Sequence, residues 1–237
     1  MKRVVEPEWL DFLPAADPRA TASRRDLRRV NWLTGSAAIL AGAIARAATR
    51  PPRILVDLGA GDGSLALRLA RRLSARWPDV RLRLVDRTPS IASSTLAAIA
   101  QTCWQVETVA ADAEEWCRSG AGESADIVVA NLFLHHFGDE ALSRLLHAVA
   151  ARTSIFAASE PRRGAVALAG SRLLGLIGCN DVTRHDAVVS VRAGFARNEL
   201  SALWPRDGWS LSEGRAGWSS HLFVARSTAM RNGAGAS

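Results

Sequence analysis

The feature that most constrains the fold is the glycine-rich segment 56–63, VDLGAGDG. It joins the apolar run 53–58, typical of a buried strand, to residues 64–76, in which leucine recurs at helical spacing. Glycines at alternate positions let the backbone turn tightly and approach a ligand without an intervening Cβ. A strand, loop and helix in this order predict a ligand site at the carboxyl edge of a sheet.

The acidic residue on this strand, Asp57, separates the loop from a dinucleotide-binding fingerprint. The glycines follow the spacing GxGxG rather than GxGxxG. A carboxylate at this place repels a pyrophosphate but suits a ligand that carries an ammonium group. Three glycines alone are also compatible with a purely structural turn. A ligand site is supported only if the ends of the other expected strands carry suitable polar residues as well.

Strands and helices alternate through the middle of the chain, which predicts βαβ units and a parallel sheet buried on both faces. Residues 161–204 are expected to be mainly helical, and 209–213 with 219–225 a terminal hairpin. The expected strands are 53–58, 80–86, 104–110, 125–131 and 154–159, and the expected helices are 24–48 (capped by Ser23), 64–76, 89–101 (opened by Pro89), 114–119 and 139–152.

Polar residues mark the ends of three consecutive expected strands. Asp86 ends the second strand, where a carboxylate can accept both hydroxyls of a ribose. Asp112 follows the third strand, where it can accept from an adenine amino group. Asn131 ends the fourth, at the edge where chemistry takes place in such sheets. Taken singly, Asp86 and Asp112 are also typical of solvated loop acids; together with Asp57 they favour a nucleoside site.

Segments 57–63, 86, 111–113 and 126–131 resemble motifs I to IV of class I S-adenosylmethionine (SAM)-dependent methyltransferases. The resemblance covers about residues 50–160 and implies a Rossmann-like α/β fold with a seven-stranded, mostly parallel sheet. The implied strand order is 3-2-1-4-5-7-6, with strand 7 antiparallel, helices on both faces and a helical cap insertion. SAM is the implied cofactor, and its implied binding residues are Asp57, Gly59, Ala60, Gly61, Gly63, Asp86, Arg87, Asp112, Ala113 and Asn131.

In the resemblance, Asp57 and the glycine loop hold the amino-acid end of SAM, Asp86 the ribose, and Asp112 with the Ala113 backbone the adenine. Segment 131–137 is similar to the one that follows strand four in quinone-type and small-molecule methyltransferases. The Asn/Asp-Pro-Pro-Tyr signature of nucleic-acid amino methyltransferases is absent, and the chain has no tyrosine.

A phenol or enol acceptor benefits from a general base, and three histidines are candidates. His136 is our first choice and His135 the second, because both follow motif IV; either is also compatible with a packing or capping role. His185 lies in the polar cluster 179–186, which forms either a catalytic His/Asp pair or, as we favour, a solvated loop between helices.

The expected reaction is SAM-dependent methylation of a small hydrophobic, phenolic or polyketide-like acceptor, at oxygen in preference to carbon. Segments 160–163 and 190–195 resemble bacterial methyltransferases of polyketide-type phenolic lipid pathways, which implies a role in secondary metabolism. Two other classes stay open. The net charge of +7 and the arginines near the N-terminus are compatible with an RNA methyltransferase. A non-catalytic SAM-binding regulatory subunit would carry the same motifs.

Composition bears on the origin of the basic charge, on metal binding and on the cellular compartment. Lys2 is the only lysine, so arginine supplies the basic charge, which a GC-rich coding sequence also explains. Three scattered cysteines predict neither a disulfide framework nor a zinc site, and we expect no metal. Lacking an apolar leader, the chain is expected in the cytoplasm, with peripheral membrane contact allowed and the oligomeric state undecided. We expect an N-terminal irregular segment and helix over 1–50, a SAM-binding domain over 51–226 with the acceptor cap at about 161–204, and a disordered tail over 227–237.

Overall fold

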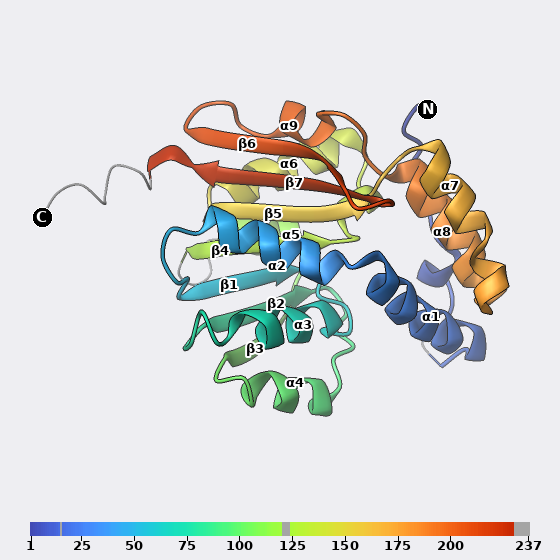
Figure 1. The fold of residues 1–237 in the computed structure, drawn as a ribbon, viewed down its shortest axis with the longest axis horizontal. Coiled ribbons are helices and arrows are strands. Elements are labelled where there is room, and N and C mark those ends of the chain that lie inside the picture. Colours follow the sequence, from blue (N-terminus) through green and yellow to red (C-terminus); the bar gives the residue numbers. More distant parts are fainter. Residues whose placement is uncertain (15, 120–123, 230–237) are drawn as a thin grey trace, which may run out of the picture.

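Seven strands form one sheet in the order β3-β2-β1-β4-β5-β7-β6 in the computed structural model, which describes residues 1–14, 16–119 and 124–229 (Figure 1). Strands β1 to β5 pair in parallel, and β7 runs antiparallel to both β5 and β6. The order and the direction of β7 confirm the expected fold. The strands are β1 Ile54–Leu58, β2 Arg81–Asp86, β3 Gln105–Ala110, β4 Ala125–Asn131, β5 Thr153–Pro161, β6 Trp209–Ala216 and β7 Ser220–Ser227.

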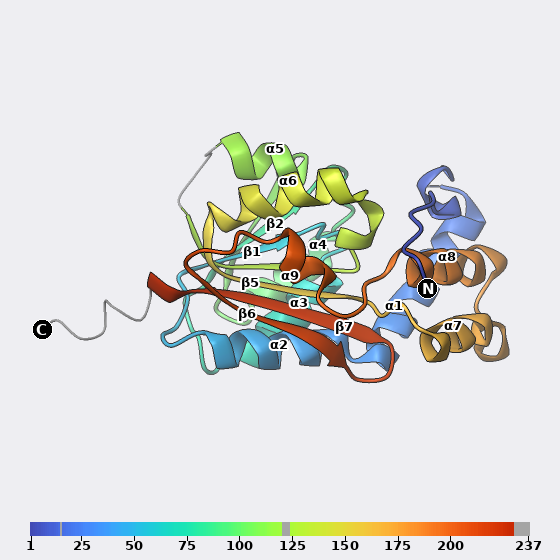
Figure 2. The ribbon, with the colours of Figure 1, turned by 90° about the horizontal axis from the view of Figure 1, so that it is seen from above.

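Helices cover both faces of the sheet and build two cores (Figures 1 and 2). One face is covered by α2 (Ser36–Ala47), α3 (Ser64–Leu73) and α4 (Ser93–Ala100). The other is covered by α5 (Ala113–Ser119), α6 (Asp139–Ala150) and α9 (Glu199–Leu203). β1 is buried along its whole length, as expected of a parallel strand with neighbours on both sides.

A third group of helices lies beyond the sheet and forms what we call the helical cap. It consists of α1 (Pro18–Thr34), α7 (Ala165–Arg172), η3 (Leu174–Ile177) and α8 (Asp181–Ala193). Figures 1 and 2 both place these helices off the end of the sheet at which the parallel strands finish. Ligands of open α/β sheets bind outside this edge, so the cap is placed to close a site there.

The first helix differs from the expectation of one helix over 24–48 capped by Ser23. α1 begins at Pro18, and the Asp17 side chain accepts from the backbone N–H of Arg19. An aspartate N-cap followed by proline in the first helical position is a strong start signal, which the density of prolines in this region obscured. Gly35, with φ of 69°, then ends α1 and starts α2 in a new direction.

Two further expectations were wrong. Pro89 does not open a helix, since α4 begins only at Ser93. The polar cluster 179–186 is not a solvated loop, because the Asn180 side chain accepts from the Thr183 N–H and caps α8. His185 is therefore a helical residue.

The expected tail begins later than Ser227, since β7 includes that residue; residues 230–237 lie outside the described part of the chain. Within the described ranges, no helix combines the length and the apolar character needed to cross a bilayer.

The core between α3 and the sheet supports a stability prediction. Leu69 is fully buried there, whereas Arg72 on the same helix is exposed. Leu69→Ala should lower the free energy of unfolding by about 2–5 kcal/mol, because it leaves a cavity in a packed core. Arg72→Ala should change it by less than about 0.5 kcal/mol. Urea denaturation followed by circular dichroism measures both; equal losses would contradict the assigned packing of α3.

Candidate active site

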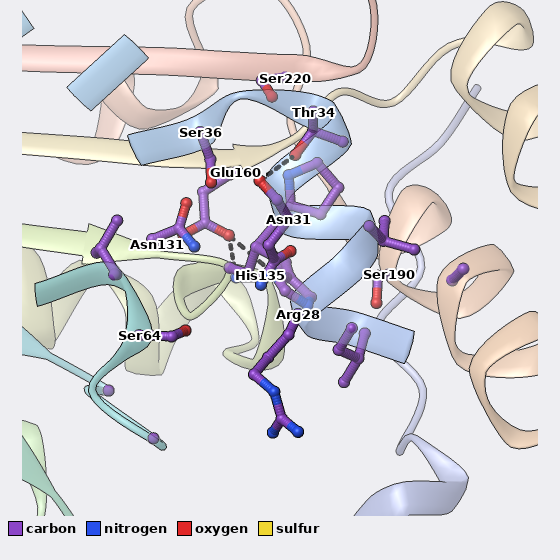
Figure 3. Close-up of a pocket in the computed structure, with 18 of the residues that line it drawn as sticks. Arg28, Asn31, Thr34, Ser36, Ser64, Asn131, His135, Glu160, Ser190 and Ser220 are labelled. Carbon is purple, nitrogen blue, oxygen red and sulfur yellow. Dashed lines mark hydrogen bonds and ion pairs between the residues drawn. The ribbon is translucent and has the colours of Figure 1, made fainter. Parts of the chain in front are cut away.

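A cavity of about 410 Å³ lies between the carboxyl ends of β1 and β4 and the helical cap (Figure 3). The glycine loop after β1 lines one side, and α1, α7 and α8 line the other. The volume lies within the range of about 300–1,000 Å³ typical of small-molecule sites. The cavity therefore has room for a nucleoside cofactor's reactive end and a compact acceptor side by side.

The glycine loop depends on two positions that only glycine suits. Gly59 has φ of +71°, and an added Cβ would lie 2.3 Å from the Phe133 ring. Gly61 has φ of +54° and faces open space, with nothing within 4 Å of an added Cβ. Its N–H donates to Asp86 Oδ2 at 2.9 Å, which ties the loop to the end of β2. The backbone is thus held open towards the cavity.

Four buried side-chain oxygens in the described residues lack a hydrogen-bond partner, and all four belong to residues that line this cavity. They are both carboxylate oxygens of Asp57 and the amide oxygens of Asn31 and Asn131. Buried polar atoms in folded proteins are nearly always hydrogen-bonded, so a cluster of unpaired acceptors indicates a ligand that supplies donors. An ammonium group and a hydroxyl group are the donors that would satisfy them.

Asp57 is the extreme case, since its side chain is fully buried. Burial, together with the nearby carboxylates of Asp86 and Asp62, raises the pKa of its carboxyl to about 8. A cation placed beside it would reverse this effect, because an opposite charge stabilises the ionised form. The electrostatics therefore favour a positively charged ligand group at the end of β1.

Glu160, at the end of β5, organises the segment that follows β4. One carboxylate oxygen accepts from the backbone N–H groups of Phe133 and Leu134, each at 3.0 Å. The other lies 2.8 Å from His135 Nδ1, as Figure 3 shows. Leu132, which follows β4, adopts φ of +52°, a backbone conformation that non-glycine residues take infrequently.

The N-terminal segment completes this corner. Glu8, next to η1 (Trp9–Asp11), places Oε1 at 3.5 Å from His135 Nε2 and accepts from the Ser190 hydroxyl. Burial lowers the pKa of His135, but hydrogen bonds and charge from Glu160 and Glu8 outweigh it and raise the pKa to about 9. His135 is therefore protonated at neutral pH.

His136 has the opposite charge state. Desolvation lowers its pKa, and the positive charge on His135 lowers it further. The two rings lie 4.2 Å apart between centroids, and His136 is exposed at the cavity wall. Glu8, His135 and His136 also place one ligand atom each within 4.8 Å of the others, close enough to share a metal ion. A chelator is therefore a necessary control in tests of proton transfer here.

The structure brings about half of the predicted site residues together. The cavity is lined by Asp57, Gly59, Ala60, Gly61, Asn131, His135 and His136. The other predicted residues do not line it: Gly63, Asp86, Arg87, Asp112, Ala113 and His185.

Asp112 and His185, like Asp86 with its bond from the Gly61 N–H, have structural partners of their own. Asp112 Oδ1 accepts from the N–H groups of Glu114 and Glu115 and so caps α5. His185 stacks on Trp9 with 3.9 Å between ring centroids, and its Nδ1 lies 3.0 Å from Asp186. His185 is thus placed outside the cavity, where a role as base is not supported.

Among the cavity residues that sequence reasoning missed, three bear directly on the chemistry of the site: Glu160, Glu8 and Asn31. Glu160 lies near the end of β5 and so follows the strand-end rule that found Asp57 and Asn131. Glu8 and Asn31 come from segments far from the motifs in sequence, and no local pattern marks them.

The family described as "Methyltransferase domain" matches residues 55–154, which span β1 to the start of β5. This match places a methyltransferase domain over residues 55–154 of the chain. The comparison with curated proteins found no match.

Solved structures share the fold of this domain. An O-methyltransferase family protein from Burkholderia thailandensis is 19% identical with a TM-score of 0.62, covering 90% of this chain and 61% of that one. The pyocyanin biosynthetic protein is 22% identical with a TM-score of 0.60, covering 94% and 62%. Magnesium protoporphyrin IX methyltransferase from Synechocystis, with bound S-adenosylhomocysteine, is 13% identical with a TM-score of 0.51, covering 92% and 91%. The chain thus spans about three fifths of the first two proteins.

The residues of the methyltransferase domain fit SAM. The unpaired Asp57 carboxylate suits the ammonium of the methionine moiety, and Asn131 adds a second buried acceptor. Gly61 leaves the space in front of the loop clear. When bound, SAM supplies an electrophilic methyl group.

The raised pKa of Asp57 predicts that binding is linked to proton release. If the ammonium of S-adenosylhomocysteine pairs with ionised Asp57, binding below pH 8 must expel the carboxyl proton. Affinity should then rise with pH up to about 8. Calorimetry at pH 7 in two buffers of different ionisation enthalpy should show close to one proton released per ligand. Asp57→Asn should abolish the release and weaken binding about 10–100-fold, as expected for losing a charge-assisted hydrogen bond. Equal heats in both buffers would contradict this assignment.

Proposed function

We propose that the protein transfers the methyl group of SAM to the oxygen of a small hydrophobic, phenolic or polyketide-like acceptor. The observation that carries the proposal is the single cavity in which the glycine loop, an apolar wall and a neutral histidine meet. Methylation needs the acceptor atom in line with the methyl group, and positioning in a dry cavity supplies much of the rate enhancement.

The wall opposite the glycine loop favours an apolar acceptor. It is built from side chains of α1, α7, η3 and α8 and of the N-terminal segment, among them Leu10, Leu27, Val30, Leu174 and Val191. Such walls are typical of sites that bind flat or aliphatic molecules and orient them with a few polar groups. Asn31, on α1, is one such group, since its buried amide oxygen is free to accept from a donor on the acceptor.

Proton removal is assigned to His136. Its lowered pKa leaves it neutral at pH 7, so a ring nitrogen can take the hydroxyl proton as the oxygen bonds to the methyl carbon. His135 is charged and cannot accept a proton at this pH. We assign His135 to positioning, because Glu160 fixes its ring and its charge keeps the neighbouring His136 unprotonated.

The acceptor class is tested by incubating the protein with methyl-labelled SAM and three sets of acceptors: phenols with alkyl chains, quinols and RNA. We expect label on the oxygen of phenols, located by mass spectrometry of the product. Label on ring carbon would redirect the proposal to C-methylation, and label on RNA alone would overturn the small-molecule acceptor. Binding of SAM without transfer to any acceptor would favour a regulatory subunit.

His136→Ala should lower kcat by about 10²–10⁴-fold while the affinity for SAM changes little, since a general base acts on the acceptor. The pH profile of the wild type should fall as the pH drops through the pKa of His136, which lies below the usual 6.5, and this limb should vanish in the variant. His147→Ala is the matched control. His147 is exposed on α6 and lies 2.8 Å from the Ser143 carbonyl, away from the cavity.

Turnover of His136→Ala within a few-fold of the wild type would remove His136 as the base. A loss that appears only with His135→Ala would move the assignment to that residue. The assays are run with and without a chelator. Loss of wild-type turnover in the chelator would show that Glu8, His135 and His136 serve a metal ion instead.

A further inference from the structure

The outermost part of the helical cap exposes an unusual concentration of aliphatic side chains. Segment 172–178, RLLGLIG, begins at the last residue of α7 and includes η3; we call it the cap tip. Leu173, Leu176 and Ile177 are 57%, 82% and 42% exposed. Contiguous apolar side chains on a surface are typical of an interaction site rather than of random surface composition.

Basic side chains surround these aliphatic groups. Arg172 and Arg184 are exposed and form no ion pair with the described residues, and the Arg184 side chain packs beside Gly175. Arg29 donates to the Ile177 carbonyl at 3.2 Å, although Asp26 neutralises it at 3.4 Å. The sequence holds no acidic residue between Glu160 and Asp181. The cap tip thus presents apolar groups within a positively charged rim.

The same segment also reaches the cavity. Leu174 lines it, together with Ala167, Gly170 and Ser171 on the inward side of α7. The cap tip therefore has one side that lines the cavity and another side that is exposed to solvent. In Figures 1 and 2, α7 and α8 lie at the end of the molecule away from the C-terminus, with α1 packed beside α8.

We propose that the cap tip docks the protein on an anionic lipid bilayer, with Leu173, Leu176 and Ile177 inserted among the acyl chains. Aliphatic insertion combined with surrounding arginines is the usual chemistry of peripheral membrane binding. Arginine can keep its guanidinium at the headgroups while its stem lies along apolar groups. Three side chains are too few for a stable protein interface, which takes about 20–30 residues on each side.

Docking would place the cavity beside the bilayer, so a membrane-dissolved acceptor reaches it without crossing water. This consequence rests on the proposed function, whereas docking itself does not. Vesicle binding is therefore measured without SAM and without acceptor, so that its failure and a failure of methyl transfer are distinguishable.

The test is co-sedimentation of the full chain with vesicles of phosphatidylcholine alone or mixed with phosphatidylglycerol. We expect binding to the mixed vesicles, weakened by salt because the arginines act through charge. Leu176→Asp should weaken binding at least about tenfold, since one leucine side chain no longer enters the bilayer. Arg172→Gln and Arg184→Gln should each weaken it about fivefold at low salt.

Val4→Asp is the matched control. Val4 is also exposed, but its N–H donates to the Arg192 carbonyl, near the opposite end of α8 from the cap tip. This variant should bind like the wild type. Since Leu176 is 82% exposed, thermal unfolding of Leu176→Asp should match the wild type and exclude misfolding as the cause.

Three results would overturn the proposal. The first is no binding to mixed vesicles at low salt, and the second is equal binding by Leu176→Asp and the wild type. The third is a concentration-dependent dimer in sedimentation equilibrium that Leu176→Asp abolishes, with no vesicle binding; the cap tip would then contact a second copy of the chain.

Discussion

The carboxylate of Asp57 lies at the end of a strand with neighbours on both sides, where no donor among the described residues reaches it. Burying an unpaired carboxyl is costly, and the group responds by holding its proton, with a pKa near 8. Its pKa is thus raised above the unfolded value, so the stability that this group contributes is lost as the pH rises towards 8. A bound cation would restore it. The glycine loop and Asn131 leave a space beside this unpaired carboxyl group, and a ligand that fills the space can supply the missing donor.

A second buried carboxylate has the opposite role. Glu160 is also fully buried, yet its oxygens accept from backbone N–H groups after β4 and from the His135 ring. It fixes the loop that carries both histidines, and the charge that it stabilises on His135 adds to desolvation in lowering the pKa of His136. Two buried acids on the strands at either side of β4 therefore have different roles: Asp57 is left for the ligand, and Glu160 stabilises the charged form of His135.

Much of the fold could be predicted from the sequence, because apolar runs alternate with amphipathic segments and turn residues separate them. The cofactor loop was visible for the same reason: Gly59 and Gly61 serve backbone positions that a local motif records. Two helix starts were missed although their signals are local, because the prolines and polar residues around them are also typical of irregular backbone. Helix α1 begins with the Asp17 cap and Pro18, and His185 is helical because Asn180 caps α8.

The acceptor side of the cavity could not be predicted, because its contacts join segments that are far apart in the sequence. Glu8 and Asn31 reach the cavity from the N-terminal segment and from α1, and only tertiary packing brings them to His135 and Asn131. The spacing of these residues along the sequence does not indicate which of them are in contact. The charge states could not be predicted either, since the two adjacent histidines have identical side chains and only His135 forms side-chain hydrogen bonds to Glu160 and Glu8.

The most direct test of the account is a crystal structure of the protein with S-adenosylhomocysteine. We expect one ligand per chain in the cavity, with its amino nitrogen about 2.7–3.2 Å from an Asp57 carboxylate oxygen. The position vacated by the methyl group should face His136. A ligand bound elsewhere, or bound in the cavity with Asp57 still unpaired, would contradict the account.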